Sequence, residues 1–301
     1  MSSNVMLATL NISVWSARKF DSKATMEVKE NHGAQQRDIG RFNKRLLPEN
    51  ASSYDAIVKL AGEARQAHYF KTMPYDQMGV RLLPAEVYLE HAEEIRAFKG
   101  RYWEAVNAFL NNMDDLKAQA RLLLNGLFRE EDYPTRDELK SKFDFRFHVL
   151  PFPNAADFNV ALPEDELERI RESIGRQSQE ASAKAMRDLW ERLYETVSKM
   201  TERLSDPNAV FRDSLVENVR DLAGLLPKMN FAGDKNLANL TKQVEDKLAV
   251  HDPETLRRNV TTRANVAQQA AEIQSIMAGF MGIEQPSEFI LEEAPAQSTL
   301  L

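Results

Sequence analysis

The stretch "SKFDFRFHVLPFPNAADFNVALPEDE", residues 141–166, concentrates aromatic side chains in a chain whose other segments mostly show polar helical patterns. Its first half, "FDFRFHV", alternates apolar and polar residues, which is the period of a strand with one buried face. Pro151 and Pro153 then end this strand, because proline cannot donate a hydrogen bond to a neighbouring strand. Five of the chain's fifteen phenylalanines lie here: Phe143, Phe145, Phe147, Phe152 and Phe158.

The second strand candidate is Leu10–Val14, where three apolar residues alternate with Asn11 and Ser13. We predict that it pairs with the phenylalanine strand, although the two lie far apart in the sequence. Phe152 and Phe158 would then close the turn into the following helix. The five phenylalanines are therefore interpreted as a structural aromatic brace. The alternative, a binding surface made of the same rings, stays open at this stage.

Two long helices are predicted on either side of this stretch. From Ala85 to Leu127 the apolar residues recur about every 3.5 positions, which is typical of a coiled-coil face. A second apolar stripe runs from Glu164 to Leu204 with a mean step of about 3.7. We expect these helices to pack as an antiparallel hairpin. The predicted fold is mainly α, with a long antiparallel coiled-coil-like helical hairpin, a small β element and additional C-terminal helices.

Four segments are predicted along the chain. Residues 1–84 hold an N-terminal strand and helices with a basic segment, and residues 85–205 hold the hairpin with the Phe-rich strand (141–160) inserted. Residues 206–281 form the C-terminal helices, and residues 282–301 form an acidic mobile tail.

Several helix starts are marked by capping residues. Asp21 precedes a helix, and a further helix covers about residues 55–71. Thr135 with Glu138 three positions later makes a capping box. Asp–Pro pairs at residues 206–207 and 252–253 indicate two further starts, because proline suits the first helical position.

The composition limits the function. With 301 residues, 43% hydrophobic and 28% charged, the chain has the balance of a soluble globular protein. It has no cysteine, which excludes disulfides, thiolate nucleophiles and cysteine-ligated metals. No apolar run is long enough to span a membrane, and the N-terminus lacks the pattern of a secretory signal. A cytoplasmic protein that does not bind membranes is expected.

The net charge of −7 is unevenly distributed. Residues 1–50 contain eight Lys or Arg against five Asp or Glu, a balance of +3, so the remainder carries −10. Within this part "RDIGRFNKRLLP" places cations at helical spacing beside Phe42 and Asn43, which could stack on or bond to a base. Residues 18–45 are thus a candidate phosphate or nucleic-acid contact, with ordinary basic surface as the alternative. Its candidate residues are Arg18, Lys19, Arg37, Arg41, Lys44 and Arg45.

No catalytic motif is visible. The eleven glycines form no phosphate-binding loop, and neither a nucleophile elbow nor a zinc-protease signature is present. The five histidines are scattered; His68 is expected to be half-buried against a backbone group, and His91 to lie on a solvated helix face. We therefore predict a protein that is not an enzyme, with no catalytic residues, no metal site and no cofactor.

Five blocks of the chain resemble an uncharacterised family of tailed phages and prophages. The resemblance extends from about residue 8 to 280. The blocks are "LNISVWSARKFDSKAT", "GRFNKRLLP", "EARQAHYFKTMPYDQMGVRLLPA", "LFREEDYPTRDELKSKFDFRFHVLPFPNAADF" and "FRDSLVENVRDLAGLLP". Members of this family are often encoded near a MoxR-type AAA+ ATPase and a von Willebrand factor A or cobaltochelatase-like protein. The resemblance implies no catalytic residues.

Three functions follow as expectations. The first is a phage-encoded interaction protein in the host cytoplasm, acting as adaptor or substrate of a MoxR-type ATPase complex. The second is a nucleic-acid-binding accessory factor that uses residues 18–45, and the third is a virion structural protein. A homo-oligomer stays open, because a heptad stripe covered within one chain has the same sequence pattern as one covered between chains.

Overall fold

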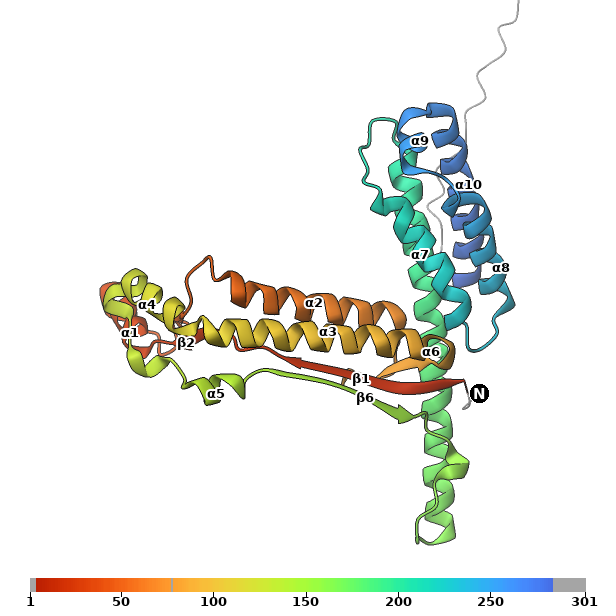
Figure 1. The fold of residues 1–301 in the computed structure, drawn as a ribbon. Coiled ribbons are helices and arrows are strands. Elements are labelled where there is room, and N and C mark those ends of the chain that lie inside the picture. Colours follow the sequence, from red (N-terminus) through yellow and green to blue (C-terminus); the bar gives the residue numbers. More distant parts are fainter. Residues whose placement is uncertain (1–3, 77, 284–301) are drawn as a thin grey trace, which may run out of the picture. The chain divides into compact units, whose positions relative to one another are not determined.

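The computed structural model describes residues 4–76 and 78–283, and it is mainly helical with small antiparallel sheets (Figure 1). The strands are β1 (Val5–Ser13), β2 (Arg18–Phe20), β3 (Asn43–Arg45), β4 (Met73–Pro74), β5 (Arg81–Pro84) and β6 (Asp144–Pro151). The helices are α1 (Ser22–Asn31), α2 (Ser52–Lys71), α3 (Ala85–Asn111), α4 (Met113–Leu124), α5 (Arg136–Lys140), α6 (Glu164–Ser205), α7 (Ser214–Met229), α8 (Lys235–Val244), α9 (Pro253–Arg258) and α10 (Val260–Met281). Short 3₁₀ turns cover Asn125–Leu127, Glu130–Asp132 and Ala155–Asp157, and a π-helical turn covers Glu245–Ala249. The predicted mainly α class with a small β element is confirmed.

The chain forms two compact units, one up to Ala185 and one from Met186 onward, and the boundary falls inside α6. The predicted segments end where β5, α6 and α10 end, but their division into domains stays a prediction. The predicted acidic tail lies outside the described residues from position 284 onward.

The first unit contains the predicted pairing between its two distant strands. β1 and β6 are antiparallel neighbours, with Leu10 opposite Phe147 and Ile12 opposite Phe145, so this prediction is confirmed. On its other side β1 pairs with β5, and β5 pairs with β4, which gives the order β4-β5-β1-β6. Strands β4 and β5 are two and four residues long, too short to show a period in the sequence.

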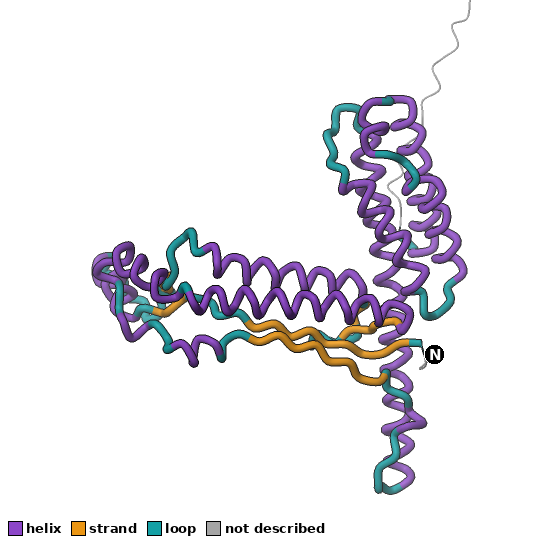
Figure 2. The backbone as a smooth tube through the Cα atoms, viewed as in Figure 1, coloured by secondary structure: helices purple, strands orange, loops and turns teal. Residues whose placement is uncertain are grey.

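Helices α2 and α3 run side by side along this sheet (Figures 1 and 2). The stripe of α3 is fully buried at Tyr102, Val106 and Phe109. The predicted hairpin between residues 85–127 and 164–204 is not confirmed, because α3 packs against α2 instead. An apolar stripe shows that a helix face is buried, but it does not identify the element that covers it.

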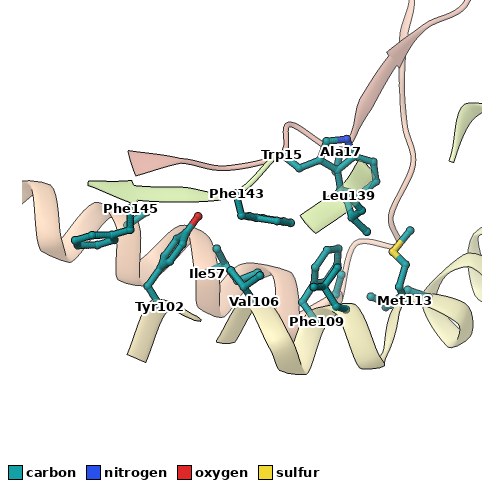
Figure 3. Close-up of a cluster of buried hydrophobic side chains, with 14 of the residues drawn as sticks. Trp15, Ala17, Ile57, Tyr102, Val106, Phe109, Met113, Leu139, Phe143 and Phe145 are labelled. Atoms are coloured by element: carbon teal, nitrogen blue, oxygen red, sulfur yellow. The ribbon is translucent and has the colours of Figure 1, made fainter. Parts of the chain in front are cut away.

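The core of the first unit is rich in aromatic rings (Figure 3). Phe143 meets Phe109 edge to face at 5.8 Å between ring centroids, and Phe145 lies 5.4 Å from Tyr102. Phe143, Phe145 and Phe152 are buried, while Phe147 and Phe158 are half-buried. Phe147 lies at the edge of this core, packed against its buried residues.

The first long helix is interrupted, contrary to prediction. α3 ends at Asn111 and α4 begins at Met113, so residues 85–127 do not form one helix. Arg136 stabilises this break, because its guanidinium donates to Leu110 O at 2.7 Å and to Asn111 Oδ1 at 2.6 Å. Arg136 opens α5, whose predicted capping box between Thr135 and Glu138 is confirmed.

The second unit consists of the part of α6 after Ala185 together with α7 to α10. α6 ends within one residue of its prediction, but the helix start predicted at residues 206–207 is wrong, since α7 begins at Ser214. The buried guanidinium of Arg263 holds the intervening turn by donating to four carbonyl oxygens. These acceptors belong to Arg203, Leu204, Asp206 and Ala209.

The helix start at residues 252–253 is confirmed, and Asp252 Oδ2 accepts from Thr255 N at 2.9 Å. The helix is shorter than its apolar pattern suggests, because it ends at Arg258. Asn259 then starts α10 by accepting from Thr262 N at 3.0 Å. The cap at Asn259 therefore divides one continuous apolar pattern into two helices, α9 and α10.

Replacing Phe145 with Ala removes a ring that is 1% exposed and opens a cavity in the core. We expect the free energy of unfolding to fall by about 3–5 kcal/mol. Urea titration followed by the fluorescence of Trp15 and Trp103, in a Trp190→Phe background, measures this. Leu150→Ala on the same strand is the control, because Leu150 is 54% exposed. Equal stability of the two variants would contradict the brace.

Candidate interaction surface

The basic segment, residues 18–45, folds as the two short strands β2 and β3 with α1 and a non-helical stretch between them, so its predicted cations do not share one helix as their spacing suggested. The chain leaves β1 and enters β2 through Ala17, whose φ of 52° is left-handed. β2 then pairs antiparallel with β3, which places Arg18 opposite Arg45 and Phe20 opposite Asn43. Directly opposed residues share a face, so the two arginines lie together on this two-stranded ribbon.

Most of the predicted cations are exposed to solvent. Arg18, Lys19, Arg37, Arg41 and Arg45 are exposed, and in residues 4–76 and 78–283 none of them has an ion-pair partner. The Arg41 guanidinium lies 5.8 Å from the centroid of the Phe20 ring. Opposed like charges destabilise a strand pair, so a negatively charged partner at this face would relieve the repulsion.

Lys44 is the exception, since it is 3% exposed. Its Nζ lies 2.8 Å from Asp21 Oδ2, 2.7 Å from Asp132 Oδ2 and 2.7 Å from Leu127 O. Burial by itself lowers the pKa of Lys44, but the hydrogen bonds to Asp132 and Asp21 outweigh it and raise the pKa above its usual value. The hydrogen bond from Lys44 is also the main cause of the lowered pKa of Asp21. Lys44 is therefore a structural cation and is not available to a phosphate.

A leucine-lined hollow of about 640 Å³ lies beside the ribbon. Its apolar lining comes from two distant parts of the chain: Phe42, Leu47, Leu123, Leu124 and Leu127. The sequence pattern assigns Leu123 to a buried stripe, but it is 70% exposed, and its neighbour Leu122 is 82% exposed. The sequence analysis missed this surface, although the run "RLLLNGLF" carries a signal for it, because one helix face cannot bury three consecutive leucines.

Hydrogen bonds hold the ribbon and the hollow together. The Tyr133 hydroxyl donates to Leu46 O at 2.8 Å, and Asp21 N donates to Phe42 O at 2.9 Å. Together with Lys44 these contacts join β2, β3 and the segment after α4. We define the basic end as this ribbon, with its exposed cations and Phe20 and Phe42, together with the leucine hollow.

A buried histidine pair, His68 on α2 and His91 on α3, lies elsewhere in the first unit. They are 2% and 0% exposed, so both sequence interpretations are wrong. His68 Nδ1 lies 3.0 Å from His91 Nε2, and the Phe147 ring lies nearly perpendicular to both imidazole rings. The outer nitrogens, His68 Nε2 and His91 Nδ1, have no hydrogen-bond partner among the described residues. Burial lowers the pKa of His68 to about 3 and that of His91 to about 4.

No group of three His, Asp or Glu side chains in residues 4–76 and 78–283 is placed to hold a metal ion. In the same ranges no helix is both long enough and apolar enough to span a bilayer.

Comparison of the chain with protein-family models, with curated proteins and with solved structures returned no match.

Replacing Lys44 with Met leaves two buried carboxylates without their cation. We expect the free energy of unfolding to fall by about 3–5 kcal/mol, the usual cost of breaking a buried ion pair. Urea titration measures the change. Lys19→Met is the matched control, because Lys19 lies opposite Lys44 in the ladder but is exposed. A loss no larger than that of the control would show that the buried cation is dispensable.

The histidine pair predicts a pH dependence of stability. Both folded pKa values lie below the unfolded value of about 6.5, so only the unfolded chain takes up these protons as the pH falls. The contribution is fully present above pH 6.5 and is lost as the pH falls through about 4 for His91 and about 3 for His68. Between pH 7 and pH 4.5 the free energy of unfolding should fall further in the native protein than in a His68→Leu, His91→Leu variant. The difference between the two falls should be at least about 2 kcal/mol. His148→Gln, at an exposed position, should behave like the native chain. Parallel pH profiles of the native and double-variant proteins would contradict the prediction.

Proposed function

We propose that this chain is a non-enzymatic interaction protein that binds an acidic surface of a partner protein through the basic end. The observation that supports this most is the coincidence of unpaired cations, exposed rings and exposed leucines in one place. Arginine and aromatic residues are enriched in the cores of protein interfaces. An exposed apolar hollow with a charged rim is typical of a docking site.

The partner that we propose is an AAA+ ATPase of the MoxR type, with the protein acting as its adaptor or substrate in the host cytoplasm. This part rests on the resemblance of the five sequence blocks to the phage family. An acidic partner surface is what the basic end requires, because complementary charge orients the encounter of two proteins.

Nucleic-acid binding is the second candidate, and one observation favours it. Phe20 and Phe42 are 46% and 40% exposed on a ribbon that also presents Arg18 and Arg45. Exposed rings beside cations can stack on bases while the cations contact phosphates. The net charge of −10 beyond residue 50 opposes this candidate, because it would repel a long nucleic acid.

Affinity purification from infected cells with mass spectrometry tests the first proposal. We expect an AAA+ ATPase to co-purify with the native chain and to be lost from Arg41→Glu, Arg45→Glu and from Leu123→Asp. The control Arg176→Glu, Lys184→Glu makes the same charge change at exposed positions of α6 and should retain it. Absence of the ATPase from the native sample would refute the adaptor role. Recovery of the chain from purified virions would instead favour a virion structural protein.

A mobility-shift assay at about 50 mM salt tests the second candidate, because phosphate contacts are strongest at low salt. A shift that is lost on Arg41→Glu, Arg45→Glu would support it. Lys44 is left intact in this design because its replacement would disturb the fold. No shift of single-stranded or double-stranded probes at this salt would remove nucleic acid from consideration.

A further inference from the structure

A second hollow, of about 710 Å³, lies in the second unit. Aromatic rings from two helices line it, Trp190 and Tyr194 on α6 and Phe280 on α10. Trp190 and Phe280 lie 5.6 Å apart between centroids with their planes inclined by 39°. Trp190 Nε1 donates to Asp234 Oδ2 at 2.9 Å, which fixes the orientation of the indole ring.

The charged groups around these rings are mostly acidic. Glu191, Glu195 and Asp234 line the hollow against one cation, Arg187. Asp234 is already engaged, because its other carboxylate oxygen accepts from the first backbone N–H groups of α8. Glu191 and Glu195 are exposed, and in the described parts of the chain no cation pairs with either. Like charges four residues apart on a helix repel each other weakly, and a cationic ligand beside Glu191 and Glu195 would relieve that repulsion.

We propose that this hollow binds the cationic side chain of a basic peptide segment of a partner protein. The π faces of tryptophan, tyrosine and phenylalanine attract an ammonium or guanidinium group. Glu191 and Glu195 supply the opposite charge beside the rings, and a guanidinium can bond a carboxylate through two parallel N–H groups.

The size of the hollow favours a peptide over a free cation. Pockets of about 300–1,000 Å³ enclose ligands much larger than a single ammonium ion. The chain's own C-terminal residues, 284–301, contain no lysine, arginine or histidine, so they cannot provide the cation. A basic segment of a separate polypeptide therefore matches both the acidic lining and the volume of the hollow.

This site is independent of the basic end. It lies in the other unit and has the opposite charge, so it selects a partner of different chemistry. A protein with both sites could hold an acidic and a basic partner at the same time, but neither site requires the other.

Isothermal titration of the full chain with the acetylated, amidated peptide Arg-Gly-Arg-Gly-Arg tests the inference. We expect binding about tenfold tighter than that of the same peptide with citrulline in place of arginine, since citrulline keeps the shape but lacks the charge. Glu191→Gln with Glu195→Gln should weaken binding by about tenfold, and Tyr194→Leu should also weaken it. Glu202→Gln with Glu217→Gln is the matched control at exposed positions of the same unit, and it should bind as the native chain does.

The proposal is overturned if the arginine and citrulline peptides bind equally, or if neither binds. A control pair that weakens binding as much as the test pair would show attraction to net charge alone, which also overturns it. Tetramethylammonium or arginine amide binding as tightly as the peptide would identify a small-cation site instead. A melting curve for each variant separates loss of the site from loss of the fold.

Discussion

The antiparallel pairing of β1 with β6 is the constraint on which the first unit depends. It joins the N-terminus to residues 144–151 across more than a hundred intervening positions. Beyond one end of the pair the chain continues into Trp15 and Ala17, while Leu139 and Phe143 precede the other strand, and all four are buried in one core (Figure 3). The pairing therefore brings β2 and the segment between α4 and β6 to the same end of the sheet. The basic end exists because these distant segments meet.

Lys44 differs from the other predicted cations because it is buried and bonded to carboxylates. Burying an ammonium group costs several kcal/mol, and here two carboxylates and a carbonyl oxygen offset that cost. Its neighbours Arg41 and Arg45 have no such partners among the described residues, and both are exposed. One basic segment thus contains both a structural cation and a charged surface. Only the three-dimensional positions of Asp21 and Asp132 distinguish the two roles.

Features that depend on neighbouring residues in the sequence could be predicted from it. Features that depend on contact with a distant segment could not. Alternating phenylalanines located β6, and the capping residues located α5 and α9. The apolar stripe of α3 was visible, but its partner α2 was not, because a stripe is the same whichever element covers it. The burial of Lys44, His68 and His91 was also missed. Each of them depends on a group from another element, and no residue nearby in the sequence indicates it.

The most direct test of the β1–β6 pairing uses the absence of cysteine from the chain. Thr9 lies directly opposite His148 in the ladder, so Thr9→Cys with His148→Cys should form a disulfide on mild oxidation. Val149 is one position further along and points to the opposite face, so Thr9→Cys with Val149→Cys should stay reduced. Counting free thiols by mass spectrometry distinguishes the two variants. Cross-linking of the first alone is the predicted result. Failure of the first to cross-link, or equal cross-linking of both, would contradict the register on which this account rests.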